Sequence, residues 1–239
     1  MQRTGQVTVL RSGEMTRLSL GFFIVALLQV PASDRAAIAR YQAAIKSGSI
    51  EAAFTELRSL GATLPRVLES LSDSEFKQLE RDLPGAVVNR EEVLVVAPEA
   101  DYFVNLATSR GDAADRRFFA TFKMVYPDNT WPAYFVQQTD YSGCTAFGSG
   151  KLVEAYRLWS DFQKAFPNRY GAAVRNELAR VSNELTQSTC ACGDAPSIRS
   201  ELQRFIREFP TSSIRARVEE RLKALEAGKS DIRLGCISG

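Results

Sequence analysis

The chain has 239 residues, with 30 Lys and Arg against 28 Asp and Glu and a formal net charge of +2. A balance this close to neutral gives no basic footprint of the kind that binds nucleic acid, so we expect no nucleic-acid partner. The chain contains no histidine. This excludes Ser-His and Cys-His nucleophile pairs and every metal site with a histidine ligand. We expect no metal and no cofactor.

An uncharged apolar run at residues 18–30 follows Arg17 and ends at Pro31 and Ala32. The run has the length of a signal-peptide core and is too short to cross a bilayer as a helix. We therefore expect residues 1–32 to be a signal peptide and the protein to be periplasmic or secreted. A buried core helix is the alternative for the apolar run. Residues 1–14 are an upstream extension if translation starts at Met15 in place of Met1.

The expected mature chain is electrically neutral. Of the 30 basic and 28 acidic residues, three Arg and one Glu lie in residues 1–32, which leaves 27 of each sign. No later apolar stretch approaches the roughly 18 residues that a membrane-spanning helix needs. We therefore expect no transmembrane span in the mature chain.

Residues 33–126 read as an N-terminal helical region. Apolar residues recur there at spacings of three and four, starting after Asp34, a candidate N-cap. Residues 86–97 are ambiguous, because their valines and leucine are typical of strands. No convincing partner strand is visible, so we interpret this segment as a short helix or an unpaired extended stretch, with a paired sheet as the alternative.

Residues 127–150 form a long connection that is rich in aromatic residues and glycine. A connection of this length is uncommon inside a compact domain, and large aromatic side chains are frequent anchors of interfaces. We expect a binding surface here, formed by Trp131, Tyr134, Phe135 and Tyr141. The alternative is a loop pinned by Cys144, with its aromatic side chains packed against the body.

Residues 151–239 have the most regular pattern and predict a C-terminal region of helical hairpins. Amphipathic helices are expected over residues 151–165, 171–186, 197–209 and 212–225. Together with the N-terminal region, this pattern predicts an all-α fold of antiparallel helix hairpins.

One pattern, an aromatic residue followed four positions later by a second aromatic and a proline, occurs at residues 122–127, 162–167 and 205–210. Aromatic residues four apart share a helix face, and the proline cannot continue the helix. Each copy therefore predicts the end of the first helix of a pair.

The segment at residues 205–225, FIREFPTSSIRARVEERLKAL, resembles the helix-turn-helix units of tetratricopeptide-type helical-repeat proteins of the bacterial periplasm. Residues 151–185 resemble a looser copy. The resemblance implies tetratricopeptide-like or α-solenoid-like packing in the C-terminal part, and a scaffold that binds a protein or peptide without catalysis. Without the resemblance, the same residues predict two ordinary antiparallel hairpins.

Four cysteines lie in the second half of the chain: Cys144, Cys190, Cys192 and Cys236. An even count in an exported protein favours disulfides over free thiols or a four-thiolate zinc site. If each helix hairpin brings its ends together, Cys144 pairs with Cys190 and Cys192 pairs with Cys236. The crossed pattern, Cys144 with Cys192 and Cys190 with Cys236, is the close alternative.

The sequence offers no catalytic motif, and we expect no catalytic residue. Acidic side chains do occur in pairs, at Glu91 and Glu92, Asp112 and Asp115, and Glu219 and Glu220. We therefore expect an exported, non-catalytic scaffold with a protein or peptide partner. Two alternatives remain: a secreted carboxylate-dependent hydrolase whose site lies under the 127–150 loop, and an inhibitor or immunity-type binder of an exported enzyme.

Overall fold

The computed structural model describes residues 30–91, 93–139, 142–187 and 189–234. The predicted signal peptide therefore lies outside the described residues, apart from its last three positions. Within the described ranges, no helix combines the length and the apolar character needed to cross a membrane.

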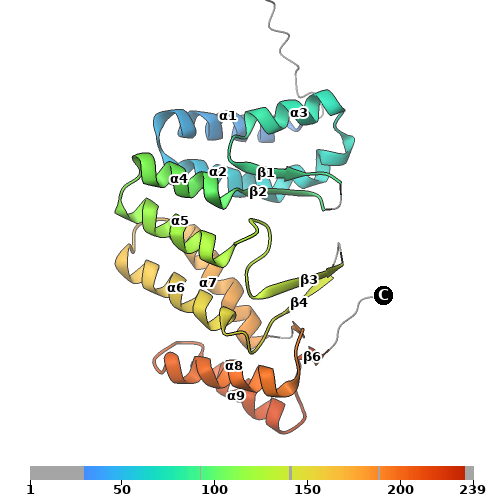
Figure 1. The fold of residues 1–239 in the computed structure, drawn as a ribbon, viewed down its shortest axis with the longest axis vertical. Helices are drawn as coiled ribbons and strands as arrows, with labels where there is room; N and C mark the ends of the chain where they lie inside the picture. The colour runs from blue at the N-terminus through green and yellow to red at the C-terminus, as the bar shows by residue number, and fades with distance from the viewer. Residues whose placement is uncertain (1–29, 92, 140–141, 188, 235–239) are drawn as a thin grey trace, which may run out of the picture.

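Four helix hairpins can be followed through the described residues, stacked along the long axis of the molecule (Figure 1). In chain order they are α1 with α2 (Ala32–Ser47, Ile50–Thr63), α4 with α5 (Ala100–Arg110, Ala113–Val125), α6 with α7 (Lys151–Ala165, Gly171–Thr186) and α8 with α9 (Ala195–Glu208, Arg215–Glu226). Neighbouring hairpins touch through α2 and α4, α5 and α6, α6 and α8, and α7 and α9. The prediction of a helical protein built from hairpins is confirmed in this coarse form.

Between the first two hairpins the chain forms the 3₁₀ helix η1 (Leu64–Ser70) and the helix α3 (Asp73–Asp82). Local sequence explains where several helices begin. Ser72 and Asp112 each form a capping box with the acidic residue three positions later, at the start of α3 and α5. Asp34 does not cap α1 as expected. The helix begins at Ala32, and Asp34 is buried, where it accepts a hydrogen bond from the Thr63 hydroxyl at 2.9 Å.

The repeated aromatic-proline pattern ends three helices in the same way. Tyr126, Phe166 and Phe209 each follow a helix with φ between −120° and −136° and ψ between 62° and 68°. Each donates its backbone N–H to the carbonyl of the aromatic residue four positions earlier, and the two rings lie 4.9 to 5.2 Å apart. The following proline disfavours helical geometry at that residue, which stops the helix there.

Two small sheets lie on one side of the stack, so the fold is mainly helical and not all-α (Figure 1). The first pairs β1 (Ala86–Asn89) with β2 (Val95–Pro98) in antiparallel fashion. The expectation of an unpaired stretch or short helix at residues 86–97 is therefore wrong, because the two halves of the segment pair with each other. The residues between them carry no two-residue turn signal such as Asn-Gly, so the hairpin is hard to see in the sequence.

The second sheet has the order β3-β4-β5-β6. Its strands are β3 (Phe135–Thr139), β4 (Ser142–Thr145), β5 (Cys190–Ala191) and β6 (Arg233–Leu234). β3 and β4 are antiparallel, whereas β4, β5 and β6 run parallel. This sheet joins the connection after α5 to the chain after α7 and after α9.

An aromatic core joins the first three helix hairpins of the chain. The ring of Phe118 on α5 stacks on Tyr170 with centroids 3.8 Å apart, and it also contacts Phe54 on α2 and Trp159 on α6. Aromatic pairs at such distances contribute about 0.5–1.5 kcal/mol each beyond the burial of their area. The hairpins are therefore held to one another by shared side chains as well as by the chain.

Candidate interaction surface

Residues 127–150, predicted as an aromatic connecting loop, contain the β3–β4 hairpin. Phe135 lies opposite Thr145 and Gln137 opposite Gly143 in this hairpin. A Cβ atom on Gly143 would lie 2.2 Å from the Phe135 ring, so the ring covers the glycine. Only glycine at this position leaves room for the ring.

Trp131 and Phe135 form a partly exposed aromatic pair in this region. Their rings stack with centroids 5.0 Å apart, and the Trp131 indole N–H donates to the side-chain oxygen of Gln137 at 2.9 Å. Both side chains are partly buried, and the neighbouring Val136 is 46% exposed. Within the described residues β3 pairs only with β4, so its second edge is unpaired. We call Trp131, Phe135, Val136 and Gln137 the hairpin surface.

Tyr134 and Tyr141 do not belong to the hairpin surface. Tyr134 is only 2% exposed and is a core residue, which corrects its expected role as a surface anchor. Burial raises the pKa of its hydroxyl, and the negative charge of Glu177 adds to the shift. Its hydroxyl oxygen has no hydrogen-bond partner among the described residues. Tyr141 lies outside the described residues.

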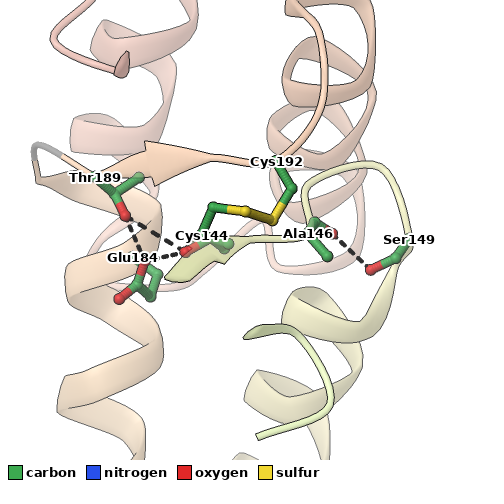
Figure 2. The surroundings of a disulfide bond; sticks show 7 residues. Cys144, Ala146, Ser149, Glu184, Thr189 and Cys192 are labelled. Atoms are coloured by element: carbon green, nitrogen blue, oxygen red, sulfur yellow. Dashed lines mark hydrogen bonds between the residues drawn. A yellow bond between two sulfur atoms is a disulfide. The ribbon is translucent and has the colours of Figure 1, made fainter. Parts of the chain in front are cut away.

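A disulfide between Cys144 and Cys192 anchors the base of the hairpin (Figure 2). Their Cα atoms are 5.1 Å apart, and Cys144 is 1% exposed. Beside the disulfide, the Glu184 carboxylate accepts hydrogen bonds from the hydroxyls of Thr145 at 2.5 Å and Thr189 at 2.7 Å. The β3–β4 hairpin is thereby fixed to the end of α7.

The favoured pairing of Cys144 with Cys190 and of Cys192 with Cys236 is wrong, and the structure has the crossed pattern for Cys144. The two cysteine segments are adjacent strands of one sheet, and the N–H of Cys192 donates to the Thr145 carbonyl at 3.1 Å. This brings Cys192 beside Cys144. Cys190 is also disulfide-bonded, and Cys236 lies outside the described residues.

A buried carboxylate, Glu177 on α7, binds polar groups from α2 and from the end of α5. It is 3% exposed and accepts a hydrogen bond from the Tyr126 hydroxyl at 2.5 Å. The Arg58 guanidinium on α2 bonds its other oxygen at 3.1 Å. Arg180 donates to the Tyr126 oxygen at 2.8 Å, so a single chain of hydrogen bonds holds both arginines. Burial, and then the charge of Glu177, raise the pKa of Tyr126 well above its ordinary value.

These two arginines line a cavity of about 280 Å³ between α2, β2, α7 and the turn after Tyr126. We call it the two-arginine cavity. Its remaining wall is mostly apolar, and its lining residues are Arg58, Gly61, Ala62, Val96, Ala97, Pro98, Tyr126, Asn129, Thr130 and Arg180. None of them is acidic, so the side chains that face the cavity carry positive charge only.

A second cavity, of about 250 Å³, lies on the other side of the same turn, between α5 and α6. Its floor is apolar and includes Ala155 and Leu158, and the exposed Met124 stands at its edge. Lys123 and Lys151 line it, but each is ion-paired, with Asp101 at 2.9 Å and with Glu154 at 3.4 Å respectively. This cavity therefore carries little unpaired charge.

The acidic pairs noted in the sequence have structural contacts. Asp112 and Asp115 form the capping box of α5, and both bind Arg169 from the connection between α6 and α7. The hydrogen bond from the Asp115 backbone and the contact with Arg169 hold the pKa of Asp112 below its usual value. Glu219 binds Arg215 on α9 at 2.8 Å. Of the first pair, Glu92 lies outside the described residues.

A third cavity, of about 270 Å³, has two carboxylates in its lining, Glu220 and Asp231. Both side chains are exposed, and Asp231 is ion-paired with the buried Arg221 at 3.1 Å. Arg217 and Lys229 complete a surface of mixed charge. Across the described ranges, His, Cys, Asp and Glu side chains nowhere gather in a group of three that could hold a metal ion.

Neither Glu177 nor the two arginines could be identified from the sequence as a cluster. A signal for Glu177 does exist, since it lies three residues after Val174 and four before Val181 on the apolar stripe of α7. A charged residue on such a stripe is expected to be buried and paired. Its partners come from α2 and from the end of α5, which the sequence alone does not bring together.

Known proteins provide no guide to this surface. Comparison of the chain with protein families, with curated proteins and with solved structures gave no match.

Proposed function

We propose that this chain is an exported helical scaffold that binds a protein or peptide partner without catalysing a reaction, and that the partner docks on the hairpin surface. The observation that carries this proposal is the stacked, partly exposed pair of Trp131 and Phe135 beside an unpaired strand edge. Large aromatic side chains supply contact area at low entropic cost. An extended peptide can add its own backbone hydrogen bonds along such an edge.

The rigid mounting of the hairpin supports the same proposal. The disulfide at Cys144 and the Glu184 hydrogen bonds hold the base of the hairpin in place before any partner arrives. A preorganised surface loses less conformational entropy on binding. The stacked hairpins then serve as the frame that presents the surface, in keeping with the resemblance to tetratricopeptide-type scaffolds. In the inhibitor or immunity-type form of this proposal, the chain is the inhibitor and its partner is an exported enzyme.

The hydrolase alternative has less support. Beside the 127–150 loop, the lining of the cavity between α5 and α6 contains one carboxylate, Glu154, which is ion-paired with Lys151. The third cavity has two, but Glu220 and Asp231 are exposed there and Asp231 is bound to Arg221. Glycoside hydrolysis needs one carboxyl group that is protonated and one that is ionised, facing each other across a cleft. In neither of these two cavities does the lining offer two carboxyl groups that are both buried and free of an ion pair.

Selection from a random peptide library displayed on phage tests the proposal. Peptides that bind the wild-type chain should lose about tenfold or more in affinity against Trp131→Ala, because an interface aromatic is removed. Met124→Ala, which truncates an exposed apolar residue away from the hairpin surface, serves as the matched control and should bind normally. Hydrogen exchange at residues 135–139 should slow in the complex. Peptides that bind Trp131→Ala as tightly as the wild type would contradict the proposed surface.

A further inference from the structure

The two-arginine cavity has many hydrogen-bond donors and few protein groups to satisfy them. A guanidinium carries five N–H donors. Among the described contacts, Arg58 uses one of them on Glu177, and Arg180 uses one on Tyr126. The side-chain oxygen of Asn129 accepts from the Ala100 N–H at 2.7 Å, which leaves its amide N–H groups available. Arg58 is partly exposed and Arg180 is exposed, so these donors are open to a ligand that arrives from solvent.

The donors are held in place before any ligand binds. Glu177 fixes Arg58 directly, and it fixes Arg180 through the Tyr126 hydroxyl, which donates to Glu177 and accepts from Arg180. Glu177 therefore positions both arginines. An anion that binds here would meet fixed donors, which reduces the entropic cost of association.

The shape of the cavity limits the size of the ligand. A cavity of about 280 Å³ lies below the range of roughly 300–1,000 Å³ that drug-sized ligands occupy. One wall is closed tightly, because a Cβ atom on Gly61 would lie 2.5 Å from the Val96 carbonyl oxygen. The residues from Val96 to Pro98 make this wall apolar. The space suits one charged group with a short apolar stem, not a nucleotide.

We propose that the two-arginine cavity binds a carboxylate of a peptide, either its C-terminal carboxylate or an Asp or Glu side chain. Paired guanidinium forks match the two oxygens of a carboxylate. The apolar wall suits the carbon atoms next to that group. The proposal rests on the proposed function only for the source of the carboxylate, since the cavity's donors exist whether or not the hairpin surface binds a partner.

Nuclear magnetic resonance titration of the ¹⁵N-labelled chain tests the proposal with four probes. These are N-acetyl-trialanine with a free carboxylate, its C-terminal amide, the same amide with a central glutamate, and inorganic phosphate. Either or both carboxylate peptides should shift the backbone amides of Ala97, Asn129 and Thr130, and the plain amide should not. Which of the two peptides binds identifies the source of the carboxylate. Equal binding of the plain amide, or binding of phosphate alone, would overturn the proposal.

Arginine variants complete the test. Arg180→Gln should weaken carboxylate binding by about tenfold, because a charge-assisted hydrogen bond is lost. Arg175→Gln, on an exposed position of the same helix, is the matched control and should bind like the wild type. If Arg180→Gln does not fold, Arg180→Lys keeps the charge and should still weaken binding. Unchanged affinity in the folded Arg180 variant would refute the site. Trp131→Ala should leave carboxylate binding in the cavity intact. The carboxylate site can therefore be confirmed or refuted whether or not peptides dock on the hairpin surface.

Discussion

Tyr126 and Tyr134 are both buried on either side of one turn, but their hydroxyls differ in their surroundings. The Tyr126 hydroxyl bridges Glu177 and Arg180, whereas the Tyr134 hydroxyl has no partner in the described part of the chain. A buried polar group contributes to stability only when it is hydrogen-bonded, and it costs free energy when it is not. The same chemical change should therefore have different effects at these two positions.

Replacing each tyrosine with phenylalanine separates the two cases. Tyr126→Phe should lower the free energy of unfolding by about 1–3 kcal/mol, because the buried Glu177 carboxylate loses a hydrogen-bond donor. Tyr134→Phe removes an unsatisfied hydroxyl and should leave the free energy of unfolding unchanged or raise it by up to about 1 kcal/mol. Urea unfolding followed by circular dichroism measures both. Equal losses at the two positions would mean that the Tyr134 hydroxyl has a partner in solution.

Alkaline titration tests the buried tyrosines together. Burial raises the pKa of Tyr41, Tyr126, Tyr134 and Tyr170 above the ordinary value. In the unfolded chain these hydroxyls ionise near pH 10, while in the folded chain they stay protonated to higher pH. Stability is therefore fully present below pH 10 and is lost as the pH rises above it, by about 1.4 kcal/mol per pH unit for each such tyrosine.

The absorbance of tyrosinate near 295 nm gives the readout. Four of the seven tyrosines should ionise only together with the loss of helical circular dichroism. A single ionisation step of all seven near pH 10, with the helices intact, would contradict the buried placements.

At the scale of elements, a carboxylate from one helix caps another. Glu201 on α8 is 1% exposed and accepts the backbone N–H groups of Gly148, Gly150 and Val153 at 3.0, 2.8 and 3.1 Å. These groups lie at the start of α6, where backbone donors lack partners within the helix and negative charge is favoured. Glu201 therefore holds the α8–α9 hairpin against the start of α6.

Glu201→Gln should lower the free energy of unfolding by about 1–3 kcal/mol, because the amide offers one acceptor oxygen and no charge to three backbone donors, two of which are buried. Glu208→Gln provides the matched control on the same helix. Glu208 forms a surface pair with Arg204, and its loss should change stability by less than about 0.5 kcal/mol. Differential scanning calorimetry compares the two variants. Similar melting temperatures would show that the Glu201 contacts do not hold α6 in solution.

Local patterns predict the elements of this chain well where one helix decides the outcome. The aromatic-proline copies end α5, α6 and α8 at the expected residues, because ring spacing and the proline act within a single turn. The same geometry occurs at Leu83 before Pro84, where leucines replace the aromatics and hid a fourth copy. Contacts between distant segments were not visible in the sequence. The Cys144 partner and the Glu177 cluster depend on such contacts, whereas the β1–β2 pairing is local and was missed because its turn has no recognisable signal.

At the scale of the whole molecule, polar contacts reinforce the aromatic core between hairpins. Arg169 follows α6 and binds Glu51 at the start of α2 and Asp115 at the start of α5, each at 2.7 Å. The Tyr170 hydroxyl donates to the same Asp115 oxygen at 2.7 Å. One connection between helices therefore ties three hairpins together. The hairpin surface and the two-arginine cavity are both attached to this frame.

Signal-peptide cleavage during export is predicted to remove residues 1–32 from the protein. Val30 is 1% exposed and belongs to the core, and its carbonyl accepts a hydrogen bond from Arg35 at 2.5 Å. Cleavage after Ala32 would remove this buried side chain together with the Pro31 carbonyl, which accepts the N–H groups of Asp34 and Arg35. The intact mass of the protein recovered from the periplasm or the medium should correspond to a chain that begins at Ser33. A mass that retains residues 18–30 would mean that the apolar run is an anchor or a core helix.

The disulfide between Cys144 and Cys192 links β4, the strand beside the hairpin surface, to the chain just before α8. Its removal tests how much this link contributes to the stability of the whole molecule. Cys144 and Cys192 are 48 residues apart, and closing a loop of this length stabilises the fold by about 4 kcal/mol in the chain-entropy model. The double variant Cys144→Ala with Cys192→Ala should therefore melt roughly 10 °C lower. Hydrogen exchange at residues 135–145 should also accelerate, because β4 loses its covalent link to the chain after β5.

Cys190 and Cys236 provide the matched control. Arg233 lies opposite Cys190 in the sheet and three residues before Cys236 in the chain, so we expect these two cysteines to pair. Their removal should free the end of the chain and leave exchange at residues 135–145 nearly unchanged. Non-reducing peptide mapping after cleavage between Cys190 and Cys192 identifies the partners directly. A peptide that joins Cys144 to Cys190 would contradict the sheet register, since the strand order places Cys192 beside Cys144.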